Sequence, residues 1–336
     1  MSIFATATGI GSWPGTAPRQ AAEIVVGELH SMTHLVELPA RGIGADLIGR
    51  AGALLVDIAI DTVPRGYRVV ARGGAVARRA VSLLGEDMDA LEEAWELAGL
   101  RGSGRRVKVQ APGPITLAAE LELGNGHRAI TDPGAVRDLA ESLAEGVAAH
   151  RAELVRRLDT EVVVQFDEPT LPAALAGRLR GVTSLNPVHP VDEALAVELI
   201  DRCVGRAGQA AVLHCCAADI PWNVLRRSEI GAVSVDVAAL GPADLDHLGE
   251  FLEAGRTVLL GAVPAVEPAQ RPSVEQVAGA LAAVTDRLGF GRAILAERIG
   301  VTPACGLAGT TPQWARRAVE LCQQVADGLV ADPESI

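Results

Sequence analysis

The sequence predicts a single (β/α)8 barrel, on three observations. The chain has 336 residues, which is more than one small core usually holds and is typical of one large α/β barrel or of two smaller domains. Short apolar runs alternate along it with longer segments rich in Ala, Leu, Arg and Glu. Hydrophobic residues make up 49% of the chain but aromatic residues only 3%, so Val, Leu, Ala and Ile must build the core, as in parallel sheets.

The apolar runs are the expected strands of the barrel. Each run ends in Gly, Pro or a polar residue, where a strand gives way to a loop. They cover residues 4–12, 33–39, 106–114, 161–169, 210–216, 232–237, 257–263 and 298–306. The alternative architecture is a doubly wound open sheet, which normally carries a glycine-rich nucleotide fingerprint after its first strand. Here Gly9 and Gly11 are followed by Trp13-Pro14, which breaks that pattern and favours the barrel.

Helical patterns occupy the stretches between the strands, most clearly at residues 87–100, 132–158 and 273–290. The first of them lies in a long insertion between strands two and three. In the same insertion, "GYRVV" at residues 66–70 predicts a small strand or hairpin. We assign residues 1–330 to one barrel domain and expect the tail at 331–336 to be frayed.

The charge balance narrows the class of partner. Lys and Arg number 30 against 42 Asp and Glu, which gives a net charge of −12 and argues against nucleic-acid or membrane-surface binding. No apolar stretch is long enough to span a bilayer, and the first residues lack the pattern of a signal peptide, so a cytoplasmic location is expected. Five cysteines, an odd number in a chain of this length, do not indicate a disulfide framework.

Reactive side chains gather at the ends of the expected strands. In a barrel, catalytic residues come from the carboxyl ends of the strands and the loops after them. The residues found at these ends are Ser12, Glu37, Asp167, Glu168, His214, Cys215, Cys216, Asp236 and Cys305. Packing alone does not account for so many ligand-type residues at one rim.

The stretch "LHCC" at the end of strand five suggests a metal site. Strand alternation places His214 and Cys216 on one face and Cys215 on the other, where it would pack as a small apolar residue. Asp236 and Cys305 would complete a tetrahedral set, and two thiolates with one imidazole favour zinc. A purely structural role for these residues remains open. A nucleophilic Cys–His pair is less favoured, because neighbours two apart on a strand point the same way without aiming at each other.

Four motifs together resemble the C-terminal catalytic barrel of cobalamin-independent methionine synthase. They are "GIGSWPGT" (9–16), "QFDEPTL" (165–171), "HCCAADI" (214–220) with "VSVD" (233–236), and "TPACGL" (302–307). The likeness runs over essentially the whole chain, although the family's enzymes usually have two barrels in tandem. It implies transfer of a methyl group to the thiol of homocysteine, with zinc as the cofactor and methionine as the product.

The resemblance also implies roles for particular residues. The zinc ligands that it implies are His214, Cys216, Asp236 and Cys305, although the family's acidic ligand is usually Glu. The residues that it implies for homocysteine are Ile10, Gly11, Ser12, Glu37 and Asp167. Among these, Asp167 of "DEP" is expected to hold the substrate's ammonium group and to be the catalytic carboxylate, with Glu37 as the second carboxylate.

The part of the family's site that binds the methyl donor is not matched. The family has an Asn-Trp pair that stacks on folate where this chain has Ala119-Glu120, and the loop at 261–270 lacks the family's Asp and proton-donating His. The acidic residue expected shortly after "DEP" is also missing from 170–176. These differences argue against methyltetrahydrofolate polyglutamate and favour a methylated corrinoid, either free or on a partner protein. Two alternatives stay open: a corrinoid methyltransferase for another thiol, and an inactive barrel that binds zinc or homocysteine.

Overall fold

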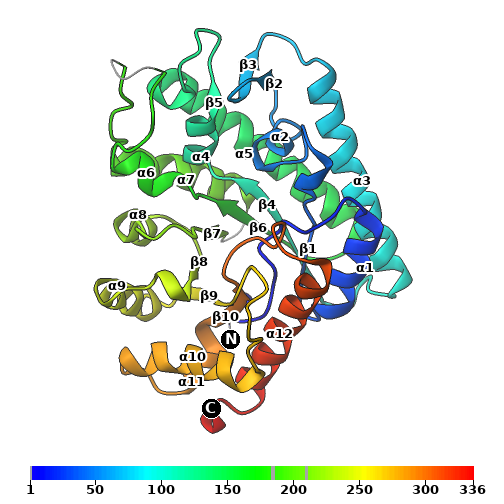
Figure 1. Cartoon of the computed structure of the whole chain (residues 1–336), viewed down its shortest axis with the longest axis vertical. Helices are drawn as coiled ribbons and strands as arrows, with labels where there is room; N and C mark the ends of the chain where they lie inside the picture. Colours follow the sequence, from blue (N-terminus) through cyan, green and yellow to red (C-terminus); the bar gives the residue numbers. More distant parts are fainter. Residues whose placement is uncertain (1, 183–185, 209–210) are drawn as a thin grey trace.

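A parallel sheet curls into a barrel surrounded by helices in the computed structural model, which describes residues 2–182, 186–208 and 211–336 (Figure 1). Within these ranges the sheet has seven strands in the order β1-β4-β6-β7-β8-β9-β10, and every neighbouring pair is parallel. Their bounds are β1 (Met32–His34), β4 (Arg106–Pro112), β6 (Val162–Asp167), β7 (Val212–His214), β8 (Ala232–Asp236), β9 (Thr257–Val263) and β10 (Ile299–Pro303). The order matches the chain order of the expected strands two to eight.

The first expected strand, residues 4–12, is not a regular strand, and this part of the prediction is wrong. The segment nevertheless takes the eighth place, because Ala7 forms a parallel bridge with Val301 of β10 and Ser12 forms one with Glu37 after β1. Glycine explains the irregularity: a Cβ at Gly9 would lie 2.2 Å from the His34 ring, and Gly11 has a φ of +151°. The segment thus closes a (β/α)8-type barrel, which confirms the predicted fold.

Helices cover the outside of the barrel. They are α1 (Pro18–Glu28), α4 (Pro114–Glu120), α5 (Pro133–Leu158), α6 (Leu171–Leu175), α7 (Glu193–Ala207), α8 (Trp222–Arg227), α9 (Pro242–Glu253), α10 (Val274–Arg287), α11 (Ala293–Arg298) and α12 (Pro312–Ala331). The helices predicted at 132–158 and 273–290 correspond to α5 and α10. Asp132 caps α5 by accepting from the N–H groups of residues 134 and 135, and Ser273 caps α10. In the tail expected to fray, residues 333–335 form a 3-10 turn.

The insertion after β1 contains a short helix, a hairpin and a long helix. These are α2 (Leu47–Ala51), β2 (Ala59–Val63), β3 (Gly66–Val70) and α3 (Ala75–Leu97), and β3 also pairs with β5 (Leu121–Glu122). The hairpin predicted from "GYRVV" is therefore present. The helix predicted at 87–100 begins earlier, at Ala75, because the residues before it continue the helical pattern and Gly85 does not interrupt it.

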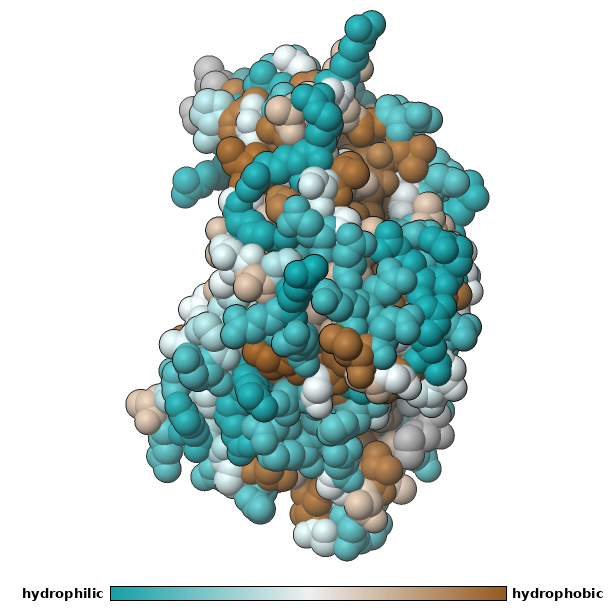
Figure 2. All heavy atoms as spheres, turned by 90° about the vertical axis from the view of Figure 1, so that its right-hand side faces the viewer, coloured by the Kyte–Doolittle hydropathy of each residue, from teal (hydrophilic) through white to brown (hydrophobic). Residues whose placement is uncertain are grey.

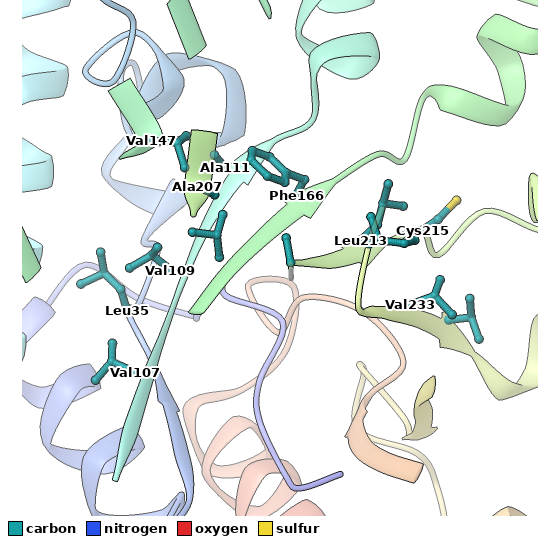
Figure 3. Close-up of a cluster of buried hydrophobic side chains, with 14 of the residues drawn as sticks. Leu35, Val107, Val109, Ala111, Val147, Phe166, Ala207, Leu213, Cys215 and Val233 are labelled. Carbon is teal, nitrogen blue, oxygen red and sulfur yellow. The ribbon is translucent and has the colours of Figure 1, made fainter. Parts of the chain in front are cut away.

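The outer and inner faces of the sheet pack against different groups of residues. The outer face packs against the helices, and Figure 3 shows part of this layer, where neighbouring strands align Ala111, Phe166, Leu213 and Val233 in one row. A smaller apolar cluster fills the barrel interior. It consists of Phe4, Met32, Val163, Val212, Ala232 and Leu259.

The outer surface is mainly polar. Figure 2 shows largely hydrophilic residues over the side on which α1 and α3 lie. None of the helices described in the structure is both long and apolar enough to cross a membrane.

A glycine in α5 allows this helix to pack closely on the turn after α2. A Cβ added at Gly146 would lie 1.6 Å from the carbonyl oxygen of Leu54. We expect Gly146→Ala to lower the free energy of unfolding by about 2 kcal/mol, because backbone must shift to make room. As a matched control, Gly85→Ala within α3 meets no atom within 4 Å and should raise stability by about 1 kcal/mol through helix propensity. Urea denaturation measures both, and equal effects of the two variants would contradict the packing argument.

Candidate functional site

A cavity of about 220 Å³ opens at the carboxyl ends of the strands. Its lining comes from the closing segment, from the ends of β6, β7 and β10, and from the stretch after β1. The lining residues are Ile10, Ser12, Glu37, Leu47, Asp167, Pro169, His214, Cys216, Cys305 and Gly306. Residues spread from position 10 to position 306 thus meet at one rim, as the barrel prediction requires.

An imidazole and two thiols meet in this cavity. The Nε2 atom of His214 and the Sγ atoms of Cys216 and Cys305 all lie within 4.8 Å of one another. The two sulfurs are 3.1 Å apart, and Nε2 is 3.9 Å from the sulfur of Cys305. Nδ1 of His214 lies 3.0 Å from the hydroxyl of Ser234, which directs Nε2 toward the thiols. The arrangement matches the donor set of a soft metal ion.

The two thiols affect each other's ionisation in opposite directions. Their mutual hydrogen bond is the largest influence on both groups, and it lowers the pKa of Cys305 while raising that of Cys216. The nearby His214 also lowers the pKa of Cys305. One thiolate therefore forms more readily than two while no cation lies between them.

Cys215 and Cys216 have different surroundings although they are adjacent in sequence. The backbone N–H of Cys215 donates to the carbonyl oxygen of Ser234, so the chain continues its extended path beyond the end of β7. The Cys215 side chain is fully buried and lies beside Leu213 in the outer apolar layer (Figure 3). Burial raises its pKa to about 12. Strand alternation separates the two thiols, as the sequence predicts.

Two of the predicted rim residues make other contacts. Asp236 ends β8, but its Oδ1 accepts from the N–H of Ala238, 2.9 Å away, and the structure does not bring it to the group of His214, Cys216 and Cys305. This local bond is typical of an aspartate at a turn. Glu168 accepts from the N–H groups of Ile115 and Thr116 and caps α4, so it does not line the cavity.

Two buried carboxylates, Asp167 and Glu37, line the cavity. Burial raises the pKa of Asp167 to about 6 and that of Glu37 to about 7. Asp167 accepts a hydrogen bond of 2.7 Å from Gln165. Among the residues described, Oε1 of Glu37 has no hydrogen-bond partner, and the Nε of Arg50 lies 3.8 Å from it. A buried oxygen without a donor is costly, so this site favours a ligand that supplies one.

Lys108 was missed by the sequence analysis. It lies in β4, is fully buried, and its Nζ donates to the carbonyl of Ile10 at 2.9 Å and to Gln165 at 2.7 Å. Gln165 also donates to the Ile10 carbonyl, so two side chains fix the turn at 10–12. Burial lowers the pKa of Lys108 to about 7, whereas Asp167 and Glu37 oppose this shift. The signal in the sequence was a lysine between the two valines of "VKV" at residues 107–109.

A known protein family matches nearly the whole chain. The model of the cobalamin-independent synthase catalytic domain matches residues 4–328. The chain belongs to this family. The resemblance inferred from the four motifs is thereby confirmed, as is the enzyme class, a methyltransferase.

Solved structures support the fold. The B12-independent methionine synthase from Shewanella sp. W3-18-1, solved with selenomethionine, has a TM-score of 0.63 at 13% identity, over 100% of both chains. A methyltransferase from Methanosarcina mazei has a TM-score of 0.58 at 15% identity, over 97% of this chain and 93% of that one. No curated protein matches the sequence. At these low identities, the likeness shows the fold alone.

Proposed function

We propose that this methyltransferase transfers a methyl group to the thiol of L-homocysteine and produces methionine. The observation that carries the proposal is that one cavity holds a soft His-Cys-Cys group beside two buried carboxylates. An amino-acid thiol can bind to both features of this cavity. Its sulfur can coordinate a thiophilic metal at the His-Cys-Cys group, and its ammonium group can pair with Asp167 and Glu37. The closing segment at Ile10, Gly11 and Ser12 would bind the remainder of the amino acid.

Zinc fits the donor set of His214, Cys216 and Cys305. A tetrahedral zinc with bonds of about 2.3 Å to sulfur places two such atoms about 3.8 Å apart. The two sulfurs are 3.1 Å apart here, so they would separate by roughly 0.7 Å to accept the ion. Asp236 is our candidate for a fourth protein ligand, and it would have to release the N–H of Ala238 to fill that place.

The residues of the chain would prepare the substrate for attack. Zinc bound at this site would supply a deprotonated thiol at neutral pH, because coordination lowers the pKa of a thiol. Asp167 and Glu37 would hold the ammonium group, and Lys108 would keep the turn at Ile10 in place beneath it. With the ammonium group and the remainder of the amino acid held in this way, the thiolate would be oriented for in-line attack on the methyl group of a donor.

The donor that we propose is a methylated corrinoid. The end of α4, where the resemblance leads us to expect a folate-stacking tryptophan, has a fully buried Ala119 and then Glu120. Glu120 is 3.5 Å from Arg128 and accepts from the hydroxyl of Thr170. A charged residue engaged in these contacts offers no surface on which a pterin can stack.

The test is methionine formation from homocysteine with either methylcobalamin or methyltetrahydrofolate, against a reaction without enzyme. We expect product from methylcobalamin. Product from the folate alone would contradict the donor proposal and leave the substrate intact. Product only from a thiol without an amino group would indicate the other corrinoid methyltransferase. Binding of homocysteine with no product from either donor would indicate a binding protein.

A further inference from the structure

Four oppositely charged side chains lie buried behind the cavity, and we call them the Glu37 network. Its members are Glu37, Arg50, Asp87 and Arg41. Asp87 receives hydrogen bonds from Arg50 and, on both oxygens, from Arg41 at 2.6 and 2.7 Å. Each of the four side chains is less than one-tenth exposed. Arg50 thus lies between a carboxylate of the cavity and a carboxylate of the insertion.

The insertion also fixes the backbone that carries Arg50. The hydroxyl of Tyr67 in β3 donates a hydrogen bond to Asp46, the residue that caps α2. The same hydroxyl accepts a hydrogen bond of 2.9 Å from the N–H of Gly44. Arg79 of α3 donates to the carbonyl oxygens of residues 41 and 43, at 2.8 and 3.0 Å. The hairpin and α3 therefore hold α2 and the loop before it as one unit with Asp87.

Stability alone does not account for this network. Four charges removed from water carry a large desolvation cost, and well-packed apolar residues of similar volume are often at least as stable. The network is also incomplete in one place, because Oε1 of Glu37 and Nη2 of Arg50 are buried and have no hydrogen-bond partner among the described residues. Glu37 lines the cavity, and a buried carboxylate that lacks a hydrogen-bond donor is suited to a cationic group of a ligand.

We propose that Arg50 and Asp87 are positioning residues that hold the Glu37 carboxylate toward the cavity and thereby make the site select thiols that carry an ammonium group. The inference rests on the proposed function and identifies the insertion as the source of that selectivity. Arg50 also opposes the burial that raises the pKa of Glu37, which favours the ionised form that an ammonium group needs.

The test compares homocysteine with mercaptobutanoate, which is homocysteine without its amino group. Calorimetry on the zinc-loaded protein gives the ratio of the two affinities, and steady-state kinetics gives kcat and KM. In Asp87→Asn and Arg50→Met we expect the preference for homocysteine to fall about tenfold or more, because the carboxylate is no longer held in place. Affinity for mercaptobutanoate, zinc content and kcat at saturation should stay near the wild-type values, and Arg50→Lys should keep part of the preference.

Asp89→Asn is the matched control. Asp89 lies on α3, as Asp87 does. Its side chain pairs with Arg157 at 2.7 Å and is 71% exposed. It should leave the preference unchanged. An unchanged preference in Asp87→Asn and Arg50→Met overturns the inference alone. An equal loss for both ligands assigns the network a structural role and also overturns it. If the wild-type protein does not prefer homocysteine, the proposed substrate class fails as well. Should Asp87→Asn not fold, the two Arg50 variants decide.

Discussion

Replacing Cys216 by serine should remove the metal from the protein. We expect about one zinc per chain in the wild type and close to none in Cys216→Ser, because serine replaces one of two soft thiolates with a poor ligand for zinc. Cys305→Ser should behave in the same way, since the two sulfurs lie 3.1 Å apart and both face His214. Mass spectrometry of metals in protein purified without chelators measures the content.

The neighbouring cysteine provides the control. Cys215→Ala should keep a full complement of zinc and lose roughly 1 kcal/mol of stability, because its fully buried side chain packs in the outer apolar layer. Zinc that persists in both Cys216→Ser and Cys305→Ser would contradict the proposed site. Loss of zinc in Cys215→Ala, with zinc retained in Cys216→Ser, would reverse the assignment of the two thiols.

The parts of the site that strand geometry determines were predictable from sequence. In a parallel barrel, register aligns residues of neighbouring strands, and Asp167, His214 and Ser234 do form one row across β6, β7 and β8. Alternation then decides which side chains share a face, so Cys215 and Cys216 could be separated without a structure. The position of Cys305 followed from the closure of the barrel.

The remaining features depend on contacts between distant residues. The irregular path of residues 4–12 follows from the side chains of His34 and Gln110, which pack where Cβ atoms of Gly9 and Gly11 would lie. The contact of Arg50 with Asp87 joins two helices of an insertion whose packing has no sequence period. The turn that bonds Asp236 to Ala238 is a local choice between hydrogen bonds of similar energy. Neither periodicity nor spacing encodes such choices.

Substituting the buried aspartate of "DEP" should remove most of the activity. In Asp167→Asn we expect kcat/KM for homocysteine to fall roughly 200- to 5000-fold, because removing one partner of a buried charge pair costs about 3–5 kcal/mol. The carboxylate is nearly the same shape as the amide, so the cavity should keep its form and the zinc content should not change. Steady-state kinetics at saturating methyl donor measures the loss.

A Glu168 variant is the control that distinguishes loss of the ammonium contact from a general effect of altering "DEP". It is the next residue and is fully buried, yet it caps α4 and does not line the cavity. Glu168→Gln should therefore lower stability while changing KM for homocysteine only a few-fold. Asp167→Asn should weaken homocysteine far more than mercaptobutanoate, because only the former has a positive charge to lose its partner. Equal weakening of both thiols would assign Asp167 to the support of His214, its neighbour across β6 and β7, rather than to the substrate.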